Sequence, residues 1–461
     1  MWRTRLGKRL IVVYYFFLFM FKTYSKLKSI ALGPAGVLAG YVIVFLAAYN
    51  RDLKGIFPFI FTDESSEAFI QFFYYVTALL SKWSMFWDHY LYLPTQAAPQ
   101  SPLLSPVTLV LLVLCQIFQV KSFIGSAILF ATGSYCIQIL MGFSVYLLLR
   151  SLAIGQLAAF AGGIIYSYNW FAAFFGIHQG YYRATAMLFV PLIFLFLIRF
   201  TQGKGNPLTN LICSGLFLGF ALAGNGDVKT TFVFLPLLAL WMLSITSSKD
   251  IWKKVFALLL VLFIGAALFL GQFSLTFDAF QESSRQDFGY EKSANISGPL
   301  RLTQGNLVLS YSQTSYSLLT GILFPQTFFQ VSRYNPIIGV SEFVPWEQRI
   351  SITLPILFLI LVGISAASKL LNRVFLINFA ILISYFISGT TFFGSLWEPI
   401  SRIFMLRYPT RASVLLYFMS ALYAALGVQL LFSRKLVGHP AIKKMLLGLG
   451  SILLIIFLII S

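Results

Sequence analysis

Apolar runs of membrane-spanning length recur through the 461 residues of this chain. A helix that crosses the hydrocarbon core of a bilayer needs about 20 mostly apolar residues. Only 10% of the residues are charged, whereas soluble domains carry about a quarter, so water cannot be the main solvent of this surface. We therefore predict an all-α fold, a polytopic transmembrane bundle of about 11–13 helices with external loop regions. The apolar candidates are 29–49, 122–149, 151–167, 184–199, 208–224, 229–246, 255–273, 351–367, 374–389, 412–433 and 444–460.

Two further apolar runs, 10–21 and 103–120, are less suited to crossing. The first is short and is predicted to lie along the membrane interface. The second opens with prolines. Whether it crosses the membrane can be inferred from the distribution of charge, because Lys and Arg of short loops remain in the cytoplasm. With a cytoplasmic N-terminus and an outward crossing at 29–49, every basic cluster from Arg150 onward is cytoplasmic only if 103–120 does not cross. We therefore predict that 103–120 is re-entrant or packs against the outer ends of other helices.

The net charge of +19 reports membrane topology in this arrangement. The predicted cytoplasmic side holds 19 basic residues and a single acid, Asp250, whereas the external side holds 14 basic and 13 acidic residues. Nearly the whole excess of positive charge is therefore on the predicted cytoplasmic side, where it orients the helices. No nucleic-acid partner is predicted. We expect an integral, multi-pass protein of the plasma membrane with a cytoplasmic N-terminus.

No repeat of about 20–50 residues is present, so 1–461 is predicted to form a single membrane domain. Two external stretches are too long to be simple connections. The first external loop, 50–121, is predicted to contain amphipathic helices and the re-entrant segment. The second, 274–350, is rich in polar and aromatic residues. The three cysteines lie in apolar runs without metal-ligand spacing, and we interpret them as small packing residues.

The segment that precedes the amphipathic stretch 68–80 carries three acids, Asp63, Glu64 and Glu67. Asp63 could cap the following helix, with the glutamates close to the positive end of its dipole. A carboxylate at the outer membrane surface could equally take a proton from a hydroxyl nucleophile. The two interpretations are compatible, because capping needs only one or two of the acids.

Other polar groups recur on the predicted external side. Asp88 and His89 lie among aromatic residues that also suit a membrane-interface belt. His178 and Arg183 belong to a short loop that could line a site, although a histidine is often satisfied locally. Asp227 follows Asn225-Gly226, where a tight turn is the simpler explanation.

Arg407 and Arg411 are basic residues on the external side, directly before the apolar run 412–433. The planar guanidinium matches phosphate oxygens, and a helix N-terminus attracts anions. Pairing with external acids or lipid headgroups is the alternative. These arginines predict a phosphate-binding group outside the membrane.

Several nucleotide and hydrolase motifs are absent from the sequence, namely GxxxxGK[ST], HExxH and GxSxG. No cofactor is therefore predicted. A divalent metal would be compatible with the acids, but no ligand spacing indicates one.

The order of short motifs resembles the GT-C superfamily of multipass glycosyltransferases, which use polyprenyl-phosphate sugars. In layout the chain is most similar to bacterial glycosyltransferases of the lipoteichoic-acid-glycosylating type. The motifs extend over most of the chain. They are Trp87, Tyr90 and Pro94; Ser101-Pro102 and Ser105-Pro106; Leu147-Leu148-Leu149-Arg150; Ile165-Tyr166-Ser167; Val190-Pro191-Leu192; and Leu406-Arg407-Tyr408-Pro409-Thr410-Arg411.

The resemblance implies a lipid-linked sugar donor and a glycan or protein acceptor. In such enzymes an acid of the first external loop is the base for the acceptor hydroxyl. Asp63 matches that place best, and Glu64 is the competing candidate. Arg407 and Arg411 would stabilise the leaving lipid phosphate, with His178 assisting in phosphate or acceptor binding.

Two other classes fit the composition. A lipid or glycan transporter such as a flippase would carry polar residues through the membrane and show internal pseudo-symmetry, and neither is evident in the sequence. A non-catalytic subunit of a membrane assembly would use its aromatic external loops for protein contacts. The glycosyltransferase is the preferred hypothesis.

Overall fold

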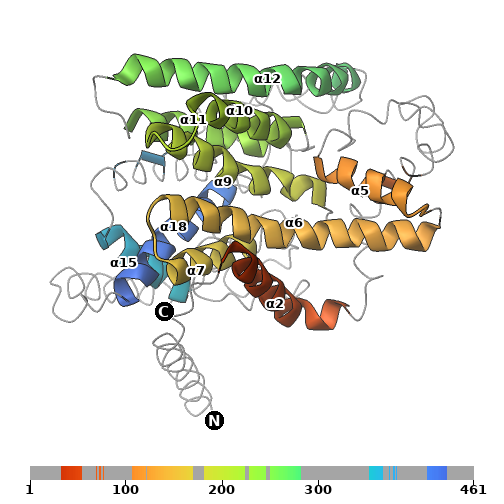
Figure 1. Cartoon of the computed structure of the whole chain (residues 1–461), viewed down its shortest axis with the longest axis horizontal. Helices are drawn as coiled ribbons and strands as arrows, with labels where there is room; N and C mark the ends of the chain where they lie inside the picture. The colour runs from red at the N-terminus through yellow and green to blue at the C-terminus, as the bar shows by residue number, and fades with distance from the viewer. Residues whose placement is uncertain are drawn as a thin grey trace, which may run out of the picture. The chain divides into compact units, whose positions relative to one another are not determined.

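The computed structural model (Figure 1) describes residues 33–53, 69, 72–73, 76, 106–120, 122–169, 181–223, 228–244, 250–281, 352, 354–366, 373, 377–378, 381 and 413–432. Within these ranges the secondary structure is helical, with ten helices, which confirms the prediction of an all-α fold. The chain divides into two compact units, 1–49 and 50–461, which are described separately.

The first unit is described from Gly33 to Tyr49 and contains most of helix α2 (Pro34–Leu53). Pro34 occupies the first helical position, where its fixed φ suits the helix and its missing N–H costs no hydrogen bond. The helix corresponds to the apolar run 29–49 and is apolar from Pro34 to Ala47.

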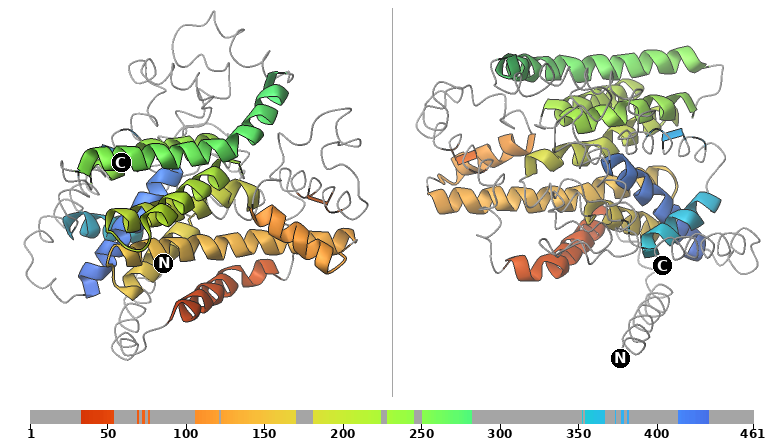
Figure 2. Two further views of the ribbon diagram at one scale, coloured as in Figure 1. Left: turned by 45° about the horizontal axis from the view of Figure 1, so that its top comes forward. Right: turned by 180° about the vertical axis from the view of Figure 1, so that it is seen from behind.

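The second unit holds the other nine described helices. They are α5 (Pro106–Ile117), α6 (Phe123–Ser151), α7 (Gln156–Ser167), α9 (Tyr181–Thr201), α10 (Pro207–Ala223), α11 (Val228–Ser244), α12 (Ile251–Gln281), α15 (Leu354–Ala366) and α18 (Ser413–Phe432). Figures 1 and 2 show α12 along one edge of this unit, with α10 and α11 between α12 and α9.

Three of the described helical segments are long and apolar enough to cross a membrane: Phe123–Ser151, Ile251–Leu270 and Leu415–Phe432. Several other helices are apolar but shorter, such as Thr185–Thr201 and Pro207–Leu222. A multi-pass membrane protein is therefore plausible from length and composition. The number of crossings and the cytoplasmic N-terminus remain predictions.

Helices α5 and α6 form a hairpin. The chain reverses after Ile117 through Gln119, which adopts a φ of 48°, and the Ser122 hydroxyl then caps α6 by accepting from the Gly125 N–H at 3.0 Å. A Cβ on Gly133 of α6 would lie 2.5 Å from Leu111 of α5, so the two helices pack closely. With 12 residues, α5 is about 18 Å long, shorter than the hydrocarbon core of about 30 Å. That this segment is re-entrant, or packs against the outer ends of other helices, remains a prediction.

Helices α10 and α12 pack through glycines. Gly215 and Gly219 form a GxxxG pair on α10, where added Cβ atoms would lie 2.6 Å from Ile264 and 2.7 Å from Leu268. In return, Leu218 lies over Gly265 of α12. Small residues at this spacing let two apolar helices approach closely, which is how membrane helices associate when lipid competes for their apolar surface. Because 215 pairs with 264 and 219 with 268, the helices run parallel.

Helix α18 lies deepest in the second unit and packs against α7, α11 and α15. Gly162 of α7 lies against the α18 residues Ala421 and Ala425, since an added Cβ would be 3.0 Å from that of Ala425. On another side of α18, Gly427 crosses Gly363 of α15 with backbone against backbone. Small side chains thus bring both α7 and α15 close to α18.

Helix α12 has two apolar faces with different surroundings. Ala257, Val261, Gly265 and Phe269, four residues apart, are buried against the rest of the unit. The opposite face exposes large side chains, including Trp252, Phe256, Leu259, Phe263 and Leu270. A soluble helix would place polar residues on that face, so this face suits contact with lipid.

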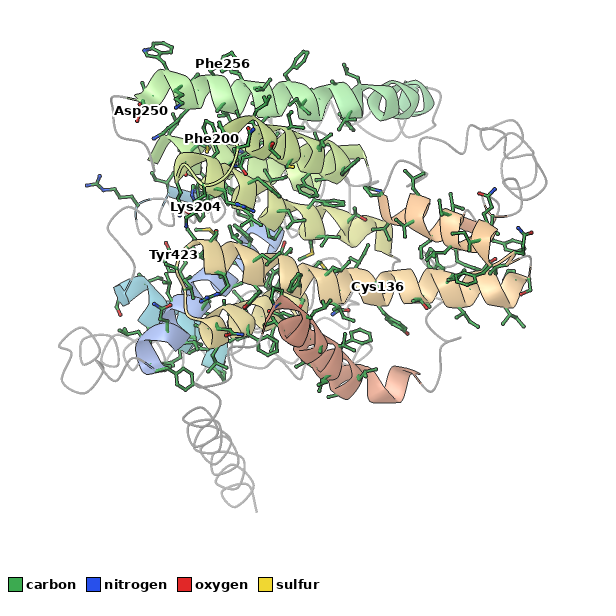
Figure 3. All side chains as sticks on the ribbon, viewed as in Figure 1. Cys136, Phe200, Lys204, Asp250, Phe256 and Tyr423 are labelled. Carbon is green, nitrogen blue, oxygen red and sulfur yellow. The ribbon has the colours of Figure 1, made fainter. Side chains whose placement is uncertain are left out.

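Helix α6 carries a similar exposed stripe that includes Cys136 (Figure 3). The interpretation of all three cysteines as packing residues is wrong for Cys136, whereas Cys115 is buried. Ile128, Thr132 and Leu140 are exposed on the same face, and the Thr132 hydroxyl donates to the Ile128 carbonyl at 2.7 Å. Because the Thr132 hydroxyl proton is bonded within the helix, Thr132 does not place an unpaired donor on this exposed face.

A nitroxide on Cys136, in a Cys115→Ala, Cys213→Ala background, is expected to collide more often with oxygen than with a nickel chelate in liposomes. Oxygen concentrates in the acyl region, and the charged chelate does not enter it. Electron paramagnetic resonance power saturation measures both collision rates. A nitroxide at Gln202→Cys, in the exposed α9–α10 turn and with Cys136 also replaced by Ala, is the control and should show the reverse preference. Equal nickel accessibility at both positions would contradict a lipid-facing stripe.

Candidate functional site

Eight of the nine site residues predicted from sequence lie outside the described residues: Asp63, Glu64, Asp88, His89, His178, Asp227, Arg407 and Arg411. The ninth, Arg183, is the third residue of α9, described as helical backbone. The structure therefore bears on the candidate site through the helix ends that flank these positions in the chain.

One end of the second unit is defined by hydrogen bonds between inter-helix connections. The Gln202 side chain, after α9, donates to the carbonyl of Ser151 at the end of α6, at 3.2 Å. The Gly155 N–H, before α7, donates to Gln429 near the end of α18, at 2.9 Å. The last turns of α6, α9 and α18 and the first turn of α7 therefore meet at one end.

This end is basic. Arg150 and Arg199 lie in the last turns of α6 and α9, where cations are favoured by the helix dipole, and Lys204 follows α9. Because α12 runs parallel to α10, the first-turn residues Lys253 and Lys254 belong to the same end. The sequence predicts a cytoplasmic position for all five, and the helix directions place them at one end. We call this the basic end.

The opposite end of these helices flanks the candidate residues. Helix α7 ends at Ser167 and α9 begins at Tyr181, on either side of His178 in the chain. Helices α10 and α11 are separated only by 224–227, which includes Asp227. Helix α18 begins at Ser413, two positions after Arg411. We call this the outer end, following the predicted orientation.

Buried hydrogen bonds join α6, α7 and α9 toward the outer end. The Gln138 side chain of α6 donates to the Ser167 carbonyl at 2.7 Å, and the Tyr166 hydroxyl donates to the Met187 carbonyl of α9 at 2.9 Å. Gln138 and Tyr166 are fully buried, and polar groups in an apolar interior need such partners. The bonds fix the ends of α7 and α9 that flank the His178 segment.

Sequence reasoning missed Gln138 as a structural residue. A glutamine in the middle of the apolar run 122–149 was the available signal, because polar residues within membrane helices usually have a partner. Its partner is a backbone carbonyl 29 residues away. Such a partner has no signature in the sequence.

A phenylalanine cluster joins the predicted first external loop to α6. Phe69 packs edge-on against Phe123 and Phe130, with ring centroids 4.9 and 5.7 Å apart, and Phe72 lies 5.7 Å from Phe130. Phe69, Phe72 and Val76 are helical and buried. Their spacing of three and four agrees with the amphipathic helix predicted over 68–80. The contacts anchor the residues that follow Asp63 and Glu64 to the N-terminal half of α6.

Replacing Phe130 with Ala is expected to destabilise this anchor by about 3 kcal/mol, because two aromatic contacts and a buried side chain are lost. Thermal unfolding in detergent and hydrogen exchange across 69–76 would measure the effect. Phe256→Ala is the control, since its ring is exposed on α12. The anchor is refuted if exchange across 69–76 is the same in both variants.

No group of three metal-ligating side chains occurs among the residues that the structure describes. The acids and histidines that could supply such ligands lie mostly outside that part of the chain.

No known protein family matches the chain, and no curated protein matches it either. The resemblance to GT-C glycosyltransferases therefore rests on the short motifs of the sequence alone. The helical architecture is compatible with that resemblance, but many unrelated functions share helical membrane folds. Function must accordingly be argued from the residues.

Proposed function

We propose that the chain is a membrane glycosyltransferase, which transfers a sugar from a polyprenyl-phosphate-linked donor to a glycan or protein acceptor outside the cytoplasm. One observation carries the proposal. The segments with His178, Asp227 and Arg411 are flanked by helix ends opposite the basic end. The acidic segment precedes residues anchored to the start of α6, at the same outer end.

The chemistry assigns one role to the acids and another to the arginines. Asp63, or Glu64 as the competing candidate, accepts the proton of the acceptor hydroxyl as its oxygen bonds to the anomeric carbon. The bond from that carbon to the phosphate oxygen breaks, and polyprenyl phosphate leaves with the electron pair. Arg407 and Arg411 stabilise the negative charge that develops on this phosphate.

The helix starts at the outer end support a phosphate there. Arg183 is in the first turn of α9 and Lys229 in that of α11, while Arg411 precedes α18. None of these first turns contains an acid, and among the three starts only α11 is directly preceded by one, Asp227. A cation close to the positive end of a helix dipole is unfavourable unless an anion is present.

The same three helices pack together in the interior. Phe194 of α9 lies 5.2 Å from Trp241 of α11 and 5.3 Å from Phe418 of α18, measured between ring centroids. Each of the three begins on the side opposite the basic end, so its positive dipole end is on the outer side. This arrangement favours a shared anionic ligand, with Asp88, His89 and Asp227 available to bind the hydroxyl groups of sugar or acceptor.

Purified protein in liposomes, supplied with a labelled polyprenyl-phosphate sugar, tests the proposal. Transfer to cell-envelope glycan or protein acceptors, with release of polyprenyl phosphate, is the expected result. Movement of the donor between leaflets without transfer would instead identify a flippase. Absence of both activities, with stable purification only alongside another protein, would identify an assembly subunit.

A further inference from the structure

Pro191 interrupts the hydrogen bonding of α9 halfway along the helix. Proline has no N–H, so the carbonyl four residues earlier, that of Met187, receives no donor from the next turn of the helix. The proline ring also crowds this carbonyl, which bends helices at such positions. Met187 is fully buried, so water cannot supply the missing bond, and an unpaired carbonyl in an apolar interior is costly.

Tyr166 supplies the donor that Pro191 lacks. Its hydroxyl, from the last turn of α7, donates to the Met187 carbonyl at 2.9 Å. Proline is tolerated in apolar helices when a neighbouring helix satisfies the freed carbonyl in this way. The bond pairs the centres of two short sequence motifs, Ile165-Tyr166-Ser167 and Val190-Pro191-Leu192, which have no part in the proposed chemistry.

The Tyr166 hydroxyl is held in place by helices other than α9. The carbonyl of the next residue, Ser167, accepts from the Gln138 side chain of α6 at 2.7 Å, which fixes the end of α7. The Tyr166 ring packs edge-on against Phe418 of α18, with ring centroids 6.0 Å apart. The hydroxyl is therefore a fixed point to which α9 is attached.

The two halves of α9 on either side of Pro191 contact different helices. In the inner half, Phe194 lies 5.2 Å from a ring of α11 and 5.3 Å from a ring of α18, measured between centroids. In the outer half, Phe189 lies 5.6 Å from a ring of α10, and the Tyr166 bond joins the helix to α7. The outer half also contains Arg183, one turn before the bonded carbonyl. The bond thus holds α9 at the place where proline has already removed a helix bond.

We propose that Pro191 is a hinge in α9 and that the Tyr166 hydroxyl holds this hinge closed. When the bond opens, the Met187 carbonyl has no helical donor to return to, so the outer turns of α9, with Arg183, pivot relative to the inner half. The proposal does not depend on glycosyl transfer. If Arg183 belongs to a binding site, as the sequence predicts, the hinge sets the position of its backbone relative to the ligand.

Hydrogen exchange of the full chain in detergent tests the pairing of the two residues. Tyr166→Phe keeps the ring and removes the donor. It is expected to speed exchange across 185–190 by about 5- to 30-fold, with little change across 195–200. In a Pro191→Ala background the same substitution should change exchange by about twofold at most, because the N–H restored at position 191 bonds to the Met187 carbonyl.

Pro236→Ala is the matched control, because it removes a proline from the interior of another apolar helix, α11. Tyr166→Phe should keep its full effect in that background. The same acceleration with and without Pro191 would overturn the pairing. So would no acceleration, or a uniform one along the whole of α9, which would show general loss of stability.

Pulsed electron paramagnetic resonance measures the hinge itself. Nitroxides at Arg183→Cys and Arg199→Cys, with the three native cysteines replaced by alanine, lie about 24 Å apart along a straight helix. Tyr166→Phe should broaden the distribution of this distance, and adding Pro191→Ala should restore a single narrow distribution. A distribution that Tyr166→Phe leaves unchanged would overturn the hinge, even if hydrogen exchange shows that the bond stabilises the outer half.

Discussion

Replacing Asp63 with Asn is expected to lower the rate of sugar transfer by about 100- to 10,000-fold, the usual contribution of a general base. The asparagine keeps the shape of the side chain but cannot accept the acceptor's proton. Donor binding should change little, so kcat falls while KM for the donor stays similar. Glu64→Gln shows this loss instead if Glu64 is the base.

Arg407→Gln and Arg411→Gln are expected to reduce kcat by about 100- to 1,000-fold each, because they remove charge that stabilises the leaving phosphate. Glu67→Gln is the control for the acidic segment and should retain nearly full activity. Release of labelled polyprenyl phosphate in liposomes measures all of these variants. Full activity in the Asp63, Glu64 and Arg407 variants alike would remove the proposed site.

Gly427→Val and Gly363→Val are expected to prevent correct packing of α15 against α18, at a cost of about 3 kcal/mol or more. A Cβ on Gly427 would overlap the carbonyl oxygen of Leu359, and one on Gly363 would overlap that of Tyr423 and lie 3.0 Å from the N–H nitrogen of Gly427. Backbone atoms cannot rotate away as a side chain can. The helices must therefore separate.

Thermal unfolding in detergent and elution as a single species would measure this effect. Gly155→Ala is the matched control, because its Cβ would meet only the Gln429 side-chain oxygen, at 4.0 Å. Because both glycines act at one crossing, the double valine variant should cost less than the sum of the single variants. Stability within 0.5 kcal/mol of the wild type in either valine variant, about the range of neutral surface substitutions, would contradict the crossing.

Most described helices coincide with apolar runs predicted from sequence. The runs 122–149 and 412–433 correspond to α6 (Phe123–Ser151) and α18 (Ser413–Phe432). The agreement has a simple cause, since in lipid the backbone must satisfy its own hydrogen bonds and an apolar run of this length becomes a helix. Helix α12 extends further than its run, to Gln281.

The candidate site was predicted from residue type and side of the membrane. Its acids and arginines remain predictions, because all lie outside the described residues except Arg183, which is part of α9. What the structure adds is the support around them. Gln138, Tyr166 and the phenylalanine cluster join helices distant in sequence, and no local pattern announces which partner each one finds.

By itself, the sequence determined that the chain forms apolar helices and that basic residues recur where those helices end. Only the tertiary structure decided which apolar face of each helix meets protein and which remains exposed, as on α12. Lipid tails and protein interiors are equally apolar, so hydropathy cannot separate the two faces. The distinction comes instead from small residues such as Gly363 and Gly427, whose partners are known only once two helices cross.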